Sequence, residues 1–290
     1  MKTWFITGAN GGLARPMVEI LLEKGDRVVA TVRKPHVLDK LQAKYGTALL
    51  EIMLDVTDGQ AIKQAVQQAI DAFGSVDVLV NNAGYGLFGA VEEASDEQIE
   101  HLFQTNFFGS LRVARAFMPH FRAQGKGHIV QISSEVGQVA NAGQGLYSAS
   151  KWAVEGAFEA LAKEAAPFNI KVTLAEPGGI RTDFFAGNGV FAQELDAYNN
   201  HLAREFKKPK SHTHGTENAD KSSILGDPQK MASAIIQCVD RGNSSETPLR
   251  MALGSDAYRD IKAVLTSRLA ELEAQKELAY STDVDNGAGF

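Results

Sequence analysis

The chain has 290 residues, 44% of them hydrophobic, which is enough to bury the core of one large α/β domain or two small ones. Its net charge is −6 and no basic block occurs, so a surface that binds nucleic acid is not expected. Cys238 is the only cysteine, which excludes an intrachain disulfide, and nothing in the sequence indicates a metal site.

The N-terminal residues enter a strand pattern at once and leave no room for the apolar region of a signal peptide. No apolar run approaches the length that a membrane span needs. We therefore expect a soluble, cytoplasmic protein with no membrane partner.

Strand and helix patterns alternate along the chain. Short β-branched or apolar runs predict strands buried on both faces at 3–7, 27–32, 49–55, 76–81, 128–133, 170–176 and 249–253. Helical patterns cover 13–23, 61–73 and 147–165, a long stretch from a capping box at Ser95 to about Phe121, and a stretch from an Asp227 N-cap to about Asp240. This rhythm predicts an α/β fold over 1–290: one domain with a doubly wound, mostly parallel, Rossmann-like sheet of about seven strands and helices on both faces.

Two segments interrupt the rhythm. Residues from about 183 to 223 begin with aromatic side chains and become polar. A long insertion of this kind in an α/β enzyme is usually a lid or is disordered, and we expect a substrate lid. The last ten residues, from about 281 to 290, are expected to form a loose tail.

A glycine-rich turn follows the first predicted strand and precedes a helix. Glycines let the backbone approach a pyrophosphate, whose charge the helix N-terminus favours. A tight turn without a ligand is the competing interpretation. The residues expected to bind a cofactor here are Gly8, Asn10, Gly11, Gly12 and Leu13.

The second predicted strand ends at Val32 and runs into Arg33. A site that prefers NAD places Asp or Glu about here, roughly 20 residues past the glycines, to hold the ribose 2′-hydroxyl. No acidic residue is present, and Arg33 could pair with a 2′-phosphate, assisted by Arg15 or Lys34. A merely solvated Arg33 competes with this hypothesis, which favours NADP(H) over NAD(H).

Two further strand ends carry residues suited to a ligand. Asp55 and Val56 follow the third predicted strand and could meet an adenine. Asn82, Ala83 and Gly84 follow the fourth, where small residues leave room in the crevice at the carboxyl ends of the strands. Each pair or triplet alone could equally be an unliganded loop.

Tyr147 and Lys151 are four residues apart, so in a helix they share a face. A free tyrosine has a pKa near 10, and an adjacent ammonium favours the phenolate and brings the pKa toward the working range. Ser134, at the end of a predicted strand, could hydrogen-bond the same reacting oxygen. Carbonyl reduction or alcohol oxidation needs such a pair of donors around one atom.

Together these residues resemble the short-chain dehydrogenase/reductase family in its common single-domain form. The shared motifs are TGANGGLA at 7–14, DV at 55–56, NNAG at 81–84, NFFG at 106–109, Ser134, Tyr147 with Lys151, and PGGIRT at 177–182. The resemblance is dense over about 3–182 and elsewhere rests on layout alone. Two features depart from the pattern: Ala14 replaces the usual third glycine, and adjacent Gly11 and Gly12 partly fit the spacing of longer, epimerase-type relatives.

The resemblance implies roles for individual residues. Tyr147 looks like the acid that protonates the carbonyl oxygen, and Lys151 like its pKa-lowering partner and a donor to the nicotinamide ribose. Ser134 looks like the group that polarises the carbonyl, and Asn106 like the residue that holds a relay water, although it could also serve as a polar residue at a helix kink. The loop implied to hold the nicotinamide end contains Pro177, Gly178, Ile180 and Thr182.

The resulting hypothesis is an NADP(H)-dependent oxidoreductase that interconverts a ketone or aldehyde and an alcohol on a moderately apolar small molecule. A non-catalytic NADP(H)-sensing or scaffold protein on the same fold is the main alternative. An epimerase or dehydratase that recycles its cofactor is a third. The helices at about 96–121 and 147–165 could pair between copies, as in many relatives, into a homodimer or homotetramer, and no sequence feature decides this.

Overall fold

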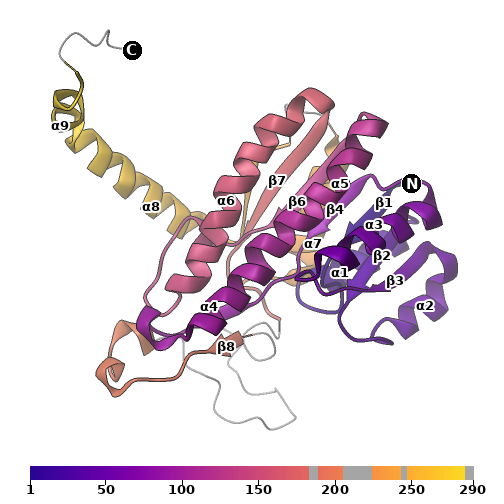
Figure 1. Cartoon of the computed structure of the whole chain (residues 1–290), viewed down its shortest axis with the longest axis horizontal. Helices are drawn as coiled ribbons and strands as arrows, with labels where there is room; N and C mark the ends of the chain where they lie inside the picture. Colours follow the sequence, from indigo (N-terminus) through magenta and orange to yellow (C-terminus); the bar gives the residue numbers. More distant parts are fainter. Residues whose placement is uncertain (183–188, 205–223, 243–246, 285–290) are drawn as a thin grey trace.

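The computed structural model describes residues 1–182, 189–204, 224–242 and 247–284. Its central sheet has seven parallel strands in the order β3-β2-β1-β4-β6-β7-β9 (Figure 1). The strands are β1 (Thr3–Ile6), β2 (Arg27–Val32), β3 (Leu49–Met53), β4 (Val78–Asn81), β6 (Gly127–Ile132), β7 (Ile170–Pro177) and β9 (Arg250–Leu253). The predicted doubly wound α/β fold is confirmed, with several strands shorter by one or more residues at an end.

Helices pack on both faces of the sheet because successive strand residues point to opposite sides. In β1, Trp4 and Ile6 join the core on one face and Phe5 joins the core on the other. The first face is covered by α1 (Ala14–Glu23), α2 (Asp39–Tyr45) and α7 (Pro228–Arg241), and the second by α3 (Gly59–Phe73), α5 (Ser110–Gln124) and α6 (Gly145–Ala165).

The predicted helix from Ser95 to about Phe121 is interrupted. Ser95 and Gln98 form the expected capping box of α4 (Asp96–Phe103), but a π-helical segment, Gln104–Gly109, separates α4 from α5. A Cβ atom at Gly109 would lie 2.8 Å from a Val56 methyl, so this glycine lets the helix pass close to the end of β3. The predicted Asp227 cap of α7 is confirmed, since its carboxylate accepts from two backbone amides.

Some elements were not predicted from the sequence. The strands β5 (Gly86–Phe88) and β8 (Gly189–Phe191) form a small parallel sheet, so part of the expected lid is paired to the loop after β4. Residues 183–188 and 205–223 of that expected lid lie outside the described residues, as do 285–290 of the expected tail.

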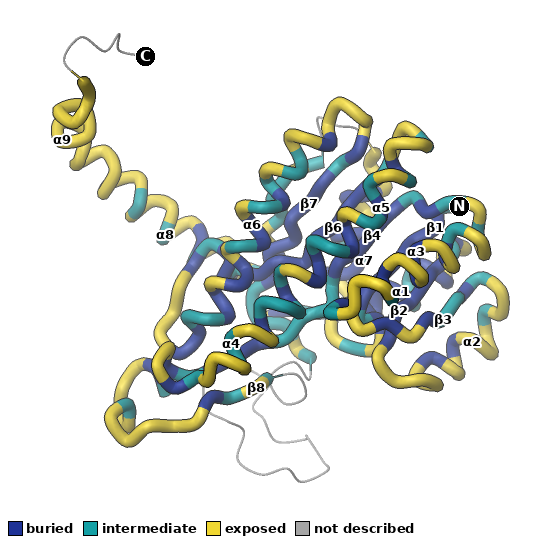
Figure 2. Tube along the Cα trace, in the orientation of Figure 1, coloured by how far each residue is buried: buried dark blue, intermediate teal, exposed yellow. Residues whose placement is uncertain are grey.

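The described C-terminal residues form α8 (Ser255–Ala274) and α9 (Lys276–Ser281), which project from the body (Figure 1). Leu265, Leu269 and Leu272 are at least half exposed on α8, and most of this arm is exposed (Figure 2). No helix among the described ranges combines the length and apolar character that crossing a membrane requires. Pairing of helices between copies stays a prediction, because one chain is described.

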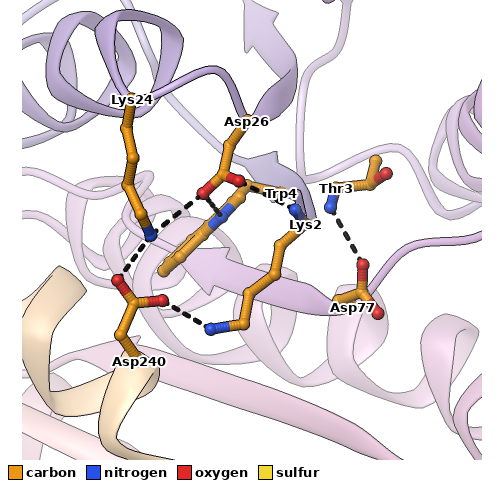
Figure 3. A network of polar contacts seen from close by, with 7 residues as sticks. All are labelled: Lys2, Thr3, Trp4, Lys24, Asp26, Asp77 and Asp240. Atoms are coloured by element: carbon orange, nitrogen blue, oxygen red, sulfur yellow. Dashed lines mark hydrogen bonds and ion pairs between the residues drawn. The ribbon is translucent and has the colours of Figure 1, made fainter.

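Charged side chains fasten the amino ends of the strands. Asp26 accepts hydrogen bonds from the Lys2 backbone at 2.8 Å, the Trp4 indole at 3.2 Å and the Lys24 ammonium at 3.3 Å (Figure 3). Asp240 of α7 pairs with both lysines (Figure 3). We call this cluster of Lys2, Trp4, Lys24, Asp26 and Asp240 the amino-edge network. It joins β1 and the end of α1 to α7, which lies far along the chain from both.

Candidate active site

A cavity of about 790 Å³ lies at the carboxyl ends of the strands. Chain order reverses between β1 and β4, and a crevice forms at such a point because the connections leave in opposite directions. Every predicted site residue except Asn106 lines this cavity: Gly8, Asn10, Gly11, Gly12, Leu13, Arg33, Asp55, Val56, Asn82, Ala83, Gly84, Ser134, Tyr147, Lys151, Pro177, Gly178, Ile180 and Thr182. Arg15 and Lys34, expected to assist Arg33, are not among the lining residues.

The glycine-rich turn is held against the end of β4. The Asn82 side chain donates to the carbonyls of Thr7 and Gly8, at 3.0 and 3.1 Å. Gly8 has a φ of +64°, and a Cβ atom there would lie 3.0 Å from the Ala83 Cα. Nothing lies within 4 Å of the Cβ positions of Gly11 and Gly12, so the turn presents open backbone to the cavity.

Tyr147 and Lys151 lie in the first turns of α6, and both are buried. The Ser134 hydroxyl lies close enough to the Tyr147 phenol to affect its pKa. The Lys151 ammonium donates to the Ile132 carbonyl at 2.9 Å and lies 5.8 Å from the Tyr147 ring centroid. The end of β6 therefore positions both side chains, through Ile132 and Ser134.

The acidities of these groups differ from the expectation. Burial raises the pKa of Tyr147 to about 12; the Ser134 hydrogen bond opposes this shift and the Glu135 charge adds to it. Burial lowers the pKa of Lys151 to about 8, against the opposing charge of Glu155. The expected lowering of the Tyr147 pKa by Lys151 is not seen, because the effect of burial on the phenol prevails. A phenol with this pKa carries its proton at pH 7.

Asn106 is buried in the π-helical segment and does not line the cavity. Its side chain accepts from the Tyr85 amide at 3.0 Å and donates to the Tyr85 carbonyl at 2.9 Å and to the Ser150 hydroxyl at 3.1 Å. These bonds tie the interrupted helix to α6 beside Lys151. The kink role is therefore visible, and the relay water stays a prediction.

The loop after β7 is held from two sides. The Gly178 amide donates to Leu253 and the Gly179 amide to the Asp256 carboxylate, each at 2.9 Å. Ile180 forms an isolated bridge with Gly226, just before α7. The start of α8 and the start of α7 thus position the cavity-lining loop at 177–182.

Segment 189–204 covers one side of the cavity, with Gly189 and Val190 in its lining. Glu93, which is fully buried, pairs with Arg204 and accepts from the Leu195 amide at 2.6 Å. The Arg204 guanidinium lowers the pKa of Glu93 to about 2, so the pair is ionised at neutral pH. Segment 189–204 is thereby fastened to the loop that follows β4.

Several lining residues were missed by the sequence analysis. One group lies between the end of β4 and the π-helical segment: Tyr85, Phe88, Glu97, Gln98, His101 and Thr105. Others flank the predicted serine and tyrosine: Ser133, Glu135, Val136 and Gln144. Proximity to Ser134 and Tyr147 was the available signal for the second group, whereas no sequence signal placed α4 here.

Comparison with known proteins agrees with this geometry. The family profile described as short chain dehydrogenase matches residues 2–189. The chain is 37% identical over 282 residues to oxidoreductase BOA17 of Botryotinia fuckeliana, covering 97% of this chain and 99% of the relative. It is 37% identical over 250 residues to 3-ketodihydrosphingosine reductase of Bacteroides thetaiotaomicron, covering 86% of each.

Comparison with solved structures also matches the chain to a short-chain dehydrogenase. A short-chain dehydrogenase from Streptomyces avermitilis superposes with a TM-score of 0.87 at 39% identity, covering 98% of this chain and 100% of that one. Among structures that share the fold at 23% identity, one holds NADP and another holds NAD.

Proposed function

Because this chain belongs to the short-chain dehydrogenase/reductase family, and so is an oxidoreductase, we propose that it is an NADP(H)-dependent enzyme that reduces a ketone or aldehyde to an alcohol, or runs the reverse reaction. The observation that carries the proposal is that the Ser134 hydroxyl and the Tyr147 phenol lie close together in the lining of the cavity at the strand ends. A protonated phenol beside a second hydroxyl suits donation of a proton to a carbonyl oxygen. A close relative named for a ketone substrate supports the same chemistry.

The cavity has room and chemistry for a dinucleotide. Open backbone at Gly11 and Gly12 suits a pyrophosphate, and the Asp55 carboxylate with Val56 suits an adenosine. The 177–182 loop and Asn82–Gly84 would hold the nicotinamide half. When bound, this cofactor supplies or accepts the hydride.

The chain's own groups supply the rest of the reaction. Ser134 donates to the substrate oxygen and polarises the carbonyl, while Tyr147 transfers its proton to that oxygen. Lys151, with a pKa of about 8, is mostly charged at neutral pH, and its ammonium donates to the Ile132 carbonyl close to the phenol ring. With a pKa of about 12, Tyr147 holds its proton at neutral pH, which is the form that carbonyl reduction requires.

The substrate end of the cavity supports a moderately apolar molecule. Phe88, Val136 and Val190 line it, and the Phe191 ring packs at a tilt against Phe88 with centroids 5.4 Å apart. We propose that the chain works as one domain in which the segment at about 183–223 is a lid. The Glu93–Arg204 pair, which anchors the described part of that segment, supports this role.

Cofactor preference rests on Arg33, an exposed cation in the cavity lining close enough to Asp55 to lower the pKa of that carboxyl. We expect NADPH to give a higher kcat/KM than NADH with a panel of ketones. Arg33→Gln is expected to raise the KM for NADPH about tenfold or more and to leave that for NADH nearly unchanged. Equal or better use of NADH by the wild type would contradict the preference.

The non-catalytic alternative predicts a different result. A sensor or scaffold would bind NADPH, seen as a thermal shift, but would show no ketone-dependent loss of absorbance at the reduced cofactor's band. Ketone-dependent oxidation of NADPH by wild type, absent in Tyr147→Phe, would exclude it.

A further inference from the structure

Glu135 follows Ser134 directly and shares its wall of the cavity. It opens a short 3-10 turn, η4 (Glu135–Gly137), whose N-cap is Ser134. Glu135 and Val136 line the cavity together with Gln144 and Tyr147 of the facing α6. Its charge is near enough to the phenol to raise the pKa of Tyr147. A carboxyl group therefore stands beside the position where the carbonyl would react.

The Glu135 carboxyl lacks the side-chain partners that two other buried carboxylates of this chain have. Its Oε2 atom is buried and has no hydrogen-bond partner among the described residues. Buried Glu93, by contrast, is paired with Arg204, and Glu176 accepts from Gln138 at 3.0 Å. Leaving a buried acceptor unpaired destabilises the folded protein, so an unpaired one in a residue that lines a ligand cavity is a candidate for a role in binding.

A second unpaired acceptor lies on the same wall. The Oε1 atom of Gln144 is also buried without a partner within the described ranges, and Gln144 directly precedes α6. Two separate segments of the cavity lining thus each contain a side chain with one oxygen that lacks a partner. A carboxamide presents either its acceptor oxygen or its donor NH₂ group, depending on its rotation. The Gln144 side chain can therefore pair with a donor or an acceptor on a ligand that Glu135 binds.

The charges around Glu135 favour a donating or positive ligand. Burial raises the pKa of Glu135 to about 7, and the charges of Asp256 and Asp260 on α8 add to this shift. Arg259 is the cation that opposes the shift, and it is exposed and already paired with Asp260 at 2.8 Å. Asp256 in turn holds the Gly179 amide, so its position is fixed. Glu135 thus has two acidic neighbours, Asp256 and Asp260, and the one cation that acts on it, Arg259, is already paired. The net charge around Glu135 is therefore negative.

We propose that Glu135 is a specificity-determining residue whose carboxyl, assisted by Gln144, receives an amino or hydroxyl group that the substrate carries beside its reacting carbonyl. This inference rests on the proposed carbonyl reduction and names its substrate class: ketones with a hydrogen-bond donor on the neighbouring carbon. A donor there can pair with the cavity-lining carboxyl of Glu135 and carboxamide of Gln144 once these side chains turn toward it. A plain alkyl ketone of the same size leaves both unpaired, which disfavours it.

The test uses three ketones of one size with NADPH: ethyl hexyl ketone, hydroxymethyl hexyl ketone and aminomethyl hexyl ketone. We expect wild type to prefer the two donor-bearing ketones over the ethyl ketone by at least about tenfold in kcat/KM. Glu135→Leu should reduce that preference to within about twofold, measured as the ratio of kcat/KM values, so that a change common to all three ketones cancels. Glu135→Gln should retain part of the preference for the hydroxyl group and lose that for the amino group, since it removes the charge alone.

Glu164→Leu is the matched control, because it removes an exposed carboxylate on α6 and should leave all three values unchanged. Melting temperatures of each variant separate a lost fold from a lost contact, and the isosteric Glu135→Gln keeps the test valid if Glu135→Leu does not fold. An unchanged preference in a folded Glu135 variant, or no preference in wild type, overturns the inference alone. Turnover of none of the three ketones overturns the proposed carbonyl reduction, and the inference with it.

Discussion

The side of the central sheet where the strands begin (the amino edge) and the side where they end (the carboxyl edge) each hold a lysine, and the pKa values of the two lysines are shifted in opposite directions. Lys24, in the amino-edge network, has a raised pKa: burial opposes the shift, but hydrogen bonds to Asp240 and Asp26 exceed it. Lys151, at the carboxyl edge, has a pKa lowered to about 8 because burial meets too little negative charge nearby. The same residue type is stabilised in its charged form at one edge and destabilised at the other.

Acceptors show the same contrast. At the amino edge, Asp26 is satisfied by three donors (Figure 3). At the carboxyl edge, Ser133, Glu135 and Gln144 each keep a buried oxygen without a partner in the described part of the chain. Paired charges tie elements together, whereas unpaired groups around a cavity cost stability and are suited to a ligand. The amino edge therefore serves the fold, and the carboxyl edge serves the reaction.

The largest expected effect is at the carboxyl edge. Tyr147→Phe removes the proposed proton donor and should lower kcat by roughly 10²–10⁴-fold, since that is the usual contribution of a positioned acid. Cofactor binding, measured by fluorescence titration with NADPH, should change little. A Tyr147→Phe enzyme with nearly normal kcat would remove the proposed acid.

The Lys151→Met variant tests whether burial of the Lys151 ammonium at the carboxyl edge lowers the stability of the folded protein. The folded pKa of about 8 lies below the ordinary 10.5, so folding disfavours the ammonium. Below pH 8 the wild type bears the full loss of stability that comes from burying the Lys151 ammonium. Between pH 8 and 10.5 the folded lysine is neutral, and this loss shrinks as the pH approaches 10.5, where the unfolded lysine loses its proton too. We expect the variant to melt a few degrees higher at pH 7 and this advantage to shrink toward pH 10.5. An advantage that grows with pH would contradict the lowered pKa.

The smallest effect on activity is expected at the amino edge. Asp26→Ala leaves the Trp4 indole and the Lys2 amide without their acceptor, so the free energy of unfolding should fall by about 1–3 kcal/mol. Urea titration measures this loss. Turnover per folded molecule should match that of wild type, because the network lies at the opposite edge from the cavity. A matching loss of kcat would break the distinction between the two edges.

Much of this arrangement follows from the sequence alone. Runs such as 27–32 are apolar on both faces, and parallel strands place all their carboxyl ends at one edge. The motifs that follow those strands, from Gly8 to Thr182, were therefore bound to meet in one place once the strands paired. The spacing of Tyr147 and Lys151 likewise fixes them on one helix face, whatever surrounds them.

Other features depend on contacts between residues far apart in sequence. Glu93 and Arg204 are separated by 111 residues, and only folding shows that one is buried against the other. The raised pKa of Tyr147 comes from burial, which no local pattern measures, and it reversed the expectation drawn from its lysine neighbour. In the sequence, Glu135 is an ordinary polar residue. Only the folded structure shows that it lines the cavity and has a buried oxygen without a partner among the described residues. Local spacing determined which groups share a helix or a strand end, and solvent exclusion in three dimensions decided their charge and their partners.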